Sequence, residues 1–248
     1  MQMAQSGAIL VHDSPAALVE AAAGLVVEVA GRAVAQRGRF TLALAGGGTP
    51  KPVYERLAGD DFAGRIDWSK TDLFFGDERC VEPNDPQSNY RMAREALLAR
   101  VPLPEANIHR IRGEADPAVA AAEYEQILRE TLRSERPRLD LVLLGIGGDG
   151  HTASLFPGTA AVREATRLVA AQYVDKLAAW RVSLAPPLLD AAAEVAFLVE
   201  GGGKAEVLAA ILEGPYQPDV LPAQRIQPTA GRVRWLVDAA AAARLRRA

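Results

Sequence analysis

The chain has 248 residues, of which 49% are hydrophobic and 24% charged, enough apolar material for one large α/β domain over residues 1–248. A formal net charge of −3 gives no electrostatic reason to expect a nucleic acid or an anionic membrane as a partner. The apolar runs are shorter than the ~20 residues of a membrane helix, and the start of the chain shows no secretory signal. We therefore expect a cytoplasmic protein. A monomer is compatible with these features, which do not determine the oligomeric state.

The first half of the chain alternates between strands and helices. Ser14 followed by Pro15 predicts a helix start, because serine caps helices and proline fits the first helical position. Apolar residues at three- and four-residue spacing extend this helix to about Gly38. In chain order we expect strand 8–11, helix 15–38, strand 40–45, helix 50–57, strand 71–75, a helix capped by Ser88, strand 108–111 and a helix over 120–132.

The second half continues this alternation. The run 141–144 is too apolar to have one wet face, as expected of a strand buried on both sides of a parallel sheet. After it we expect strands 167–172 and 181–184, a short helix from Pro186, strand 195–199, a helix over 207–212, a short helix 222–226, strand 233–237 and a terminal helix 239–247. Strands that alternate with helices of this length predict a doubly wound, mostly parallel sheet with helices on both faces.

Residues 139–157 form the strongest candidate site, because ligands of open α/β sheets bind beyond the carboxyl ends of the strands. Four glycines follow the buried strand within six residues: Gly145, Gly147, Gly148 and Gly150. Their spacing formally matches the dinucleotide-binding motif, but Pro157 and Gly158 would interrupt the helix that this motif requires. We therefore expect no nicotinamide or flavin cofactor, and we expect the glycines to admit a sugar-sized ligand close to the backbone.

His151 follows these glycines, and histidine is the side chain whose unperturbed pKa lies near neutral pH. Its position at the end of a strand favours a catalytic base over a structural or merely exposed histidine. Asp149 either orients the imidazole or is a turn-forming aspartate, and the sequence leaves both roles open. The His, Cys and carboxylate residues nowhere have the spacing of a metal site, so none is expected.

Arg79 comes just after another expected strand, in the sequence GDER at 76–79. As a fixed cation it can stabilise a developing oxyanion, or it can pair with Asp77 or Glu78 at the surface, and the two alternatives remain even. Cys80, the only cysteine, cannot form an internal disulfide. We expect it to be a small buried residue rather than a nucleophile.

Two glycine turns at expected helix starts, 46–51 and 201–204, are candidate phosphate sites. Such turns offer free backbone N–H groups and the positive end of a helix dipole. Neither has the spacing of an ATP-binding P-loop, and the alternative for both is tight helix–strand packing with solvated lysines. The candidate contacts are Gly46, Gly47, Gly48, Thr49 (also the expected N-cap of the helix), Lys51, Arg181 and Lys204.

Five segments together resemble the 6-phosphogluconolactonases of the glucosamine-6-phosphate isomerase/6-phosphogluconolactonase superfamily. They are residues 42–58, 74–92, 141–159, 197–212 and 232–242, in the order found in that family. The resemblance implies a doubly wound α/β fold and a metal-free esterase that hydrolyses a phosphorylated δ-lactone in the oxidative pentose phosphate pathway. It also implies that His151 is the general base and that Arg79 stabilises the oxyanion. Lys204, Arg181 and the turn 46–48 would bind the phosphate.

Two other functions remain as alternatives. Sugar-phosphate isomerases such as glucosamine-6-phosphate deaminase share the sequence GIGxDGH but continue with IAFNEP, whereas this chain has TASLFP at 152–157. A non-catalytic sugar-phosphate sensor, as in the effector domains of bacterial regulators, is the second alternative. The chain begins almost directly with its first expected strand, which leaves no room for an amino-terminal helix-turn-helix.

Overall fold

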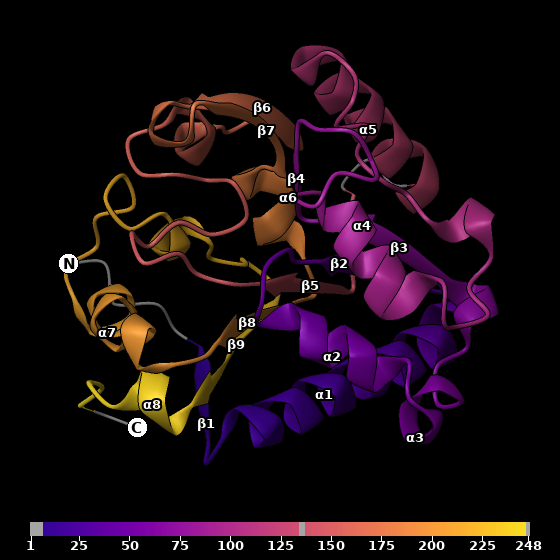
Figure 1. The fold of residues 1–248 in the computed structure, drawn as a ribbon, viewed down its shortest axis with the longest axis horizontal. Helices are drawn as coiled ribbons and strands as arrows, with labels where there is room; N and C mark the ends of the chain where they lie inside the picture. The colour runs from indigo at the N-terminus through magenta and orange to yellow at the C-terminus, as the bar shows by residue number, and fades with distance from the viewer. Residues whose placement is uncertain (1–6, 134–136, 247–248) are drawn as a thin grey trace.

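The computed structural model describes residues 7–133 and 137–246, which form two sheets surrounded by helices (Figure 1). The larger sheet has six strands, and all its neighbouring strands run parallel. In sheet order these are β1 (Ala8–His12), β9 (Arg232–Asp238), β8 (Glu194–Val199), β5 (Leu141–Leu144), β2 (Phe40–Leu44) and β3 (Thr71–Phe75). In Figure 1, α1 and α2 lie below the middle of this sheet, and α5 and α6 lie above it. The predicted doubly wound parallel sheet is confirmed.

Helix boundaries follow local capping chemistry. The Ser14 hydroxyl accepts a hydrogen bond from the backbone N–H of Ala17 at 3.2 Å, and Gly38 ends the first helix with a φ of 72°. Glycine adopts this left-handed conformation without steric cost, so the predicted start and end of this helix are confirmed. The helices are α1 (Pro15–Arg37), α2 (Pro50–Leu57), α3 (Asp60–Ala63), α4 (Asn89–Ala93), α5 (Pro117–Leu132), α6 (Pro186–Ala191), α7 (Ala205–Glu213) and α8 (Ala239–Ala242).

A second, antiparallel sheet has the order β4, β7, β6. β6 (Val169–Val174) and β7 (Ala179–Leu184) form a hairpin, close to the expected strands 167–172 and 181–184. β4 (Asp77–Arg79) was not predicted, because three polar residues carry no strand pattern of their own. It forms through its pairing with β7, about a hundred residues further along the chain.

Two predicted elements differ from the structure. The expected strand 108–111 is reduced to one isolated bridge, between Leu73 and Ile108, and no continuous strand pairing with β3 follows it. The terminal helix, expected over 239–247, is helical only as α8, whose start is capped by Asp238 accepting a hydrogen bond from the N–H of Ala241 at 2.8 Å. Residue 247 lies outside the described residues.

The sheet topology positions the site. The chain passes from β2 to β3 in one direction across the sheet, and from β5 through β8 to β9 in the other. The direction therefore switches between β2 and β5, and in open α/β sheets ligands bind beyond the carboxyl ends of strands at such a point. β2, β3, β5 and β8 are buried along their whole length, so the turns at their ends are held by a rigid core.

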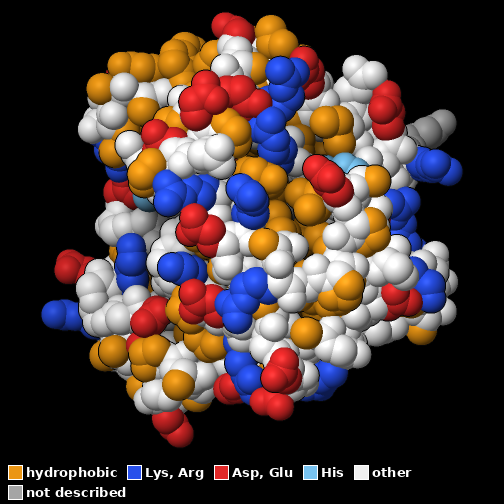
Figure 2. All heavy atoms as spheres, turned by 45° about the vertical axis from the view of Figure 1, so that its right-hand side comes forward, with side chains coloured by type: hydrophobic (Ala, Val, Ile, Leu, Met, Phe, Trp, Pro, Cys, Tyr) orange, Lys and Arg blue, Asp and Glu red, His pale blue; other side chains and the backbone are white. Residues whose placement is uncertain are grey.

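The surface is mixed in charge. On the face shown in Figure 2, basic and acidic side chains are interspersed rather than gathered into an area of one sign. Among the described residues, no helix is long and apolar enough to cross a membrane.

Candidate active site

A cavity of about 370 Å³ lies at the carboxyl ends of β2, β5 and β8. The turns that follow these strands line it, together with residues of β4. The predicted site residues in its wall are Gly46, Gly47, Gly48, Thr49, Arg79, His151 and Lys204. Asp149 and Arg181 are not in the wall, but each neighbours a residue that is.

His151 and Asp149 form a hydrogen-bonded pair. Asp149 Oδ1 lies 2.5 Å from His151 Nδ1 and also accepts the backbone N–H of His151 at 3.2 Å. Because a carboxylate only accepts hydrogen bonds, the imidazole proton lies on Nδ1 and the lone pair of Nε2 is free. The ring also stacks on Phe156, with 4.2 Å between the ring centroids. Both roles that the sequence left open for Asp149 are present in the geometry: Oδ1 accepts the backbone N–H two residues further on, as in a turn, and the same oxygen contacts the imidazole.

Gly147 makes room for this pair. A Cβ atom at Gly147 would lie 2.0 Å from His151 Nδ1 and 2.7 Å from Asp149 Oδ1, far inside van der Waals contact. Gly150 has a φ of 77° and lies against Leu221. At these two positions the protein's own side chains and a left-handed turn already require glycine. The expectation that the glycines admit a ligand stays a prediction, and Gly145 and Gly147 do line the cavity.

Burial lowers the pKa of His151 from its ordinary value of 6.5 to about 4. Asp77 acts in the opposite direction and raises this pKa, whereas the nearby cations Lys204, Arg181 and Arg79 lower it further. The imidazole is consequently neutral at pH 7, the state in which Nε2 can accept a proton.

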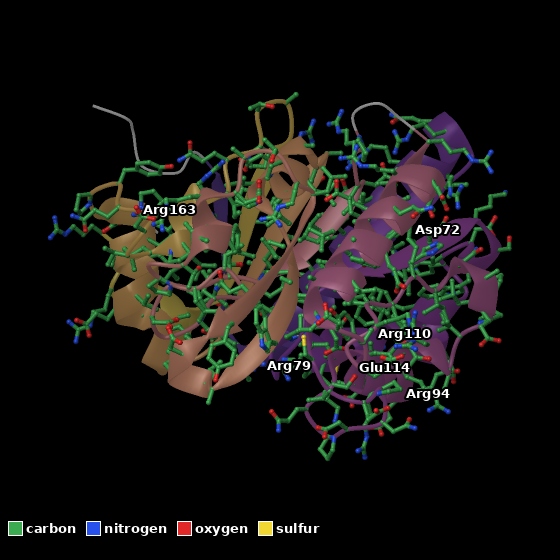
Figure 3. The ribbon with its side chains drawn as sticks, turned by 90° about the horizontal axis from the view of Figure 1, so that it is seen from above. Asp72, Arg79, Arg94, Arg110, Glu114 and Arg163 are labelled. Atoms are coloured by element: carbon green, nitrogen blue, oxygen red, sulfur yellow. The ribbon has the colours of Figure 1, made fainter. Side chains whose placement is uncertain are left out.

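The guanidinium of Arg79 contacts a backbone oxygen and not a carboxylate in the described part of the chain. It forms no ion pair among the described residues, and its Nη1 donates to the backbone oxygen of Gln87. Glu78 instead accepts the N–H groups of Asn89 and Tyr90 at 2.7 and 2.8 Å, at the start of α4. The surface pair of Arg79 with Asp77 or Glu78 is therefore absent from the described structure. Figure 3 shows Arg79 at the border between the β6–β7 hairpin and the amino-terminal half of the chain.

Arg181 lies directly opposite Arg79 in the pairing of β7 with β4. It is only 9% exposed, and its Nη1 donates to the backbone oxygen of Trp180 at 3.0 Å. Burial, and next to it the charge of Arg79, lowers the pKa of Arg181. Asp77 and Glu78 act in the opposite direction and raise this pKa. Two arginines thus lie opposite each other on neighbouring strands, an arrangement that a bound anion would stabilise.

The two glycine turns differ in how they meet the cavity. In the first, Gly47 has a φ of 99° and α2 begins at Pro50 as predicted. Thr49 lies at the predicted N-cap position, but its backbone is already helical and its side chain makes no capping hydrogen bond. Lys51 points elsewhere and lies 3.9 Å from Glu55. In the second turn, Lys204 ends the 3₁₀ turn η6 (Gly202–Lys204) and faces the cavity.

Asp77 is a wall residue whose importance the sequence did not reveal, since there it served only as a possible partner for Arg79. Its carboxylate accepts hydrogen bonds from Ser154 Oγ at 2.6 Å and from Asn89 Nδ2 at 3.2 Å. A Cβ at Gly46 would lie 2.1 Å from Asn89 Oδ1, so this glycine leaves space for the network. The sequence feature that could have identified Asp77 as a site residue is the position of a carboxylate at the end of a buried strand.

Two other chemistries find little support in the described residues. Burial raises the pKa of the Cys80 thiol to about 11, so it carries no appreciable thiolate at neutral pH. No group of three or more His, Cys, Asp or Glu side chains in the ranges 7–133 and 137–246 could hold a metal ion.

The sequence model of the family described as glucosamine-6-phosphate isomerases/6-phosphogluconolactonase matches residues 13–235. The chain belongs to this family. A family member from Nostoc sp., named 6-phosphogluconolactonase, is 43% identical over 233 residues, which cover 92% of this chain and 94% of the relative.

Solved structures of the family agree with the fold. A 6-phosphogluconolactonase from Trypanosoma cruzi superposes with a TM-score of 0.87 at 29% identity and covers 98% of both chains. A monomeric glucosamine-6-phosphate deaminase superposes with a TM-score of 0.79 at 22% identity, over 96% of this chain and 99% of the other. The second likeness concerns the fold alone, so the fold does not distinguish hydrolysis from deamination.

Proposed function

We propose that the protein hydrolyses 6-phospho-D-glucono-1,5-lactone to 6-phosphogluconate, a step of the oxidative pentose phosphate pathway. The observation that carries the proposal is a neutral imidazole with a free Nε2, held by Asp149 in the wall of a cavity that also contains the unpaired guanidinium of Arg79. The names of the relatives agree with this reaction.

The imidazole begins the reaction by activating water. His151 Nε2 removes a proton from a water molecule as the water oxygen attacks the lactone carbonyl carbon. Asp149 Oδ1, which accepts a hydrogen bond from His151 Nδ1 at 2.5 Å, stabilises the imidazolium that forms. The carbonyl oxygen becomes an oxyanion, and Arg79 supplies the nearby positive charge that stabilises it.

Collapse of the tetrahedral intermediate opens the ring. The bond between the carbonyl carbon and the ring oxygen breaks, and the imidazolium returns its proton to that oxygen. The product is the carboxylic acid of the open chain, which ionises to 6-phosphogluconate, and His151 is again neutral. One water is consumed, and the step requires no covalent nucleophile.

The phosphate positions the lactone. We assign its binding to Lys204 and the turn of Gly46, Gly47, Gly48 and Thr49, whose backbone N–H groups precede α2. Arg181, which lies opposite Arg79 in the pairing of β7 with β4, contributes positive charge. Because these groups bind a part of the substrate that does not react, they act through orientation.

The segment 152–157 favours hydrolysis over deamination. In the deaminases the corresponding segment contains an Asn-Glu pair, whereas here Leu155 and Phe156 stand at those positions. Phe156 stacks on His151 and Leu155 is fully buried, so neither position offers a second acid or base to the cavity.

The test is an assay on freshly generated 6-phosphogluconolactone, with the spontaneous rate subtracted. The wild-type protein should hydrolyse the lactone much faster than water does and should release no ammonia from glucosamine 6-phosphate. His151→Ala should lower kcat by about 10²- to 10⁴-fold while 6-phosphogluconate still binds. His12→Ala, at the end of β1 and outside the cavity, is the matched control. Full activity of His151→Ala would refute the general-base role.

A further inference from the structure

Lys176 lies at the tip of the β6–β7 hairpin, in the 3₁₀ turn η5 (Asp175–Leu177). Although 27 residues separate it from Asp149, its Nζ forms an ion pair with Asp149 Oδ2. The antiparallel sheet therefore extends a cation to the carboxylate that holds the catalytic imidazole.

The two oxygens of Asp149 have different partners. Oδ1 accepts both the backbone N–H and the Nδ1 proton of His151, whereas Oδ2 faces Lys176. Rotation about the terminal torsion of aspartate is loosely restricted by its own energetics. A cation on Oδ2 removes this freedom and keeps Oδ1 directed at the imidazole.

Phe156 contacts both His151 and Lys176. Its ring stacks on His151, and Lys176 Nζ lies 4.8 Å from the ring centroid. Lys176 is thus held by an ion pair and a cation–π contact, although half of its side chain is exposed. Exposed ion pairs contribute little to stability, so the main consequence of this contact is the position of Asp149.

We propose that Lys176 is a positioning residue that, through Asp149, holds His151 in the tautomer and orientation of a general base. The proposal rests on the lactonase function proposed above. The proposal gives the β6–β7 hairpin a role in the site, although Lys176 is distant from Asp149 in the sequence.

Removal of the Lys176 cation should change the pKa of His151 in one definite direction. The charged groups around His151 are Asp149 on its own loop, Asp77 and Arg79 on β4, Arg181 on β7 and Lys204 after β8. With Lys176 absent, the charge of Asp149 is less neutralised and the imidazolium is favoured. The pKa of His151 therefore rises, and the acid limb of the kcat profile moves to higher pH.

The first test is kinetic. Lys176→Met should lower kcat about tenfold, the loss expected from one charge-assisted hydrogen bond, with little change in KM. Lys176→Arg should retain most of kcat, since arginine can make the same contact. Lys70→Met is the matched control: Lys70 has a side chain 51% exposed and an ion pair with Asp67 at 2.9 Å, outside the site.

The second test separates positioning from a general structural role. In an Asp149→Asn background, Lys176→Met should change kcat by less than about twofold, because both residues act through one contact. Fully additive effects would overturn the proposal.

A third test does not depend on activity. Titration of the His151 imidazole by NMR, without substrate, should give a higher midpoint in Lys176→Met than in the wild type or in Lys176→Arg. An unchanged midpoint together with an unchanged kcat would overturn the role of Lys176. A wild-type protein without lactonase activity would instead refute the proposed function, and the NMR shift would still report on the contact.

Discussion

At His151, burial and nearby cations act on the imidazole in one direction and a nearby carboxylate acts in the other. Burial and three nearby cations favour the neutral ring, whereas Asp77 favours the imidazolium. Asp149 accepts a hydrogen bond from the Nδ1–H group, which leaves the lone pair of Nε2 free. An imidazole with these neighbours is neutral at pH 7, and in the proposed role as general base the charge that it would gain has a carboxylate beside it.

The pH dependence of the reaction follows from this environment. Because burial lowers the pKa of His151 to about 4, the imidazole is neutral above that pH and protonated below it. We expect kcat/KM to be nearly constant from about pH 5 to 7 and to fall about tenfold per unit below about pH 4. A pH–rate profile corrected for spontaneous hydrolysis measures this limb. A midpoint near the ordinary value of 6.5 would contradict the burial argument.

Arg79 and Lys204 should affect different kinetic constants. Arg79→Gln removes charge from the developing oxyanion and should lower kcat by about 10²- to 10³-fold with a small change in KM. Lys204→Gln removes a phosphate contact and should mainly raise KM. Lys51→Gln, beside the glycine turn but outside the cavity wall, is the control and should leave both constants unchanged. The reverse pattern would show that the two roles are exchanged.

At the scale of elements, the loop after β5 is shaped by the side chains it carries. The backbone N–H of Gly147 donates to the oxygen of His151 at 2.8 Å, and the N–H of Gly150 donates to the oxygen of Gly147 at 3.0 Å. These bonds fold the loop tightly, so the imidazole lies directly above Gly147. The loop is therefore a support for the base as well as a wall of the cavity.

This geometry distinguishes two neighbouring glycines. A Cβ at Gly147 would overlap the imidazole, so Gly147→Ala should displace His151 and lower kcat by about as much as His151→Ala, 10²- to 10⁴-fold. A Cβ at Gly148 meets nothing within 4 Å, so Gly148→Ala should retain activity. Comparison of kcat, with circular dichroism to verify folding, tests this. Equal activity of the two variants would contradict the steric argument.

At the scale of the whole molecule, the two sheets share one hydrophobic core. The core contains Leu42 and Val142 of the large sheet together with Val182 and Leu184 of the hairpin strand β7. β4 follows β3 after only Gly76, and its pairing with β7 joins the two sheets at the cavity.

We propose that these sheets form one domain and unfold together. Calorimetry should show a single transition whose van't Hoff and calorimetric enthalpies agree, because neither sheet can lose its core contacts without exposing those of the other. Two resolved transitions would contradict a single domain.

The sequence by itself determined the elements whose causes are local. The continuous apolar run 141–144 predicted the buried strand β5, the sequence patterns also predicted strands β2, β3 and β8, and Ser14-Pro15 predicted the start of α1. Because ligands of open α/β sheets bind beyond the carboxyl ends of the strands, the glycine-rich loop after residues 141–144 was also predicted to lie at a binding site.

Only the tertiary structure decided the contacts between distant segments. The pairing of β4 with β7 places Arg181 against Arg79, and the hairpin brings Lys176 to Asp149. The strand expected at 108–111 did not form, because its apolar residues found no continuous partner strand. Local patterns report which face of a segment is buried, whereas pairing depends on chain closure over many residues and on the groups that meet there.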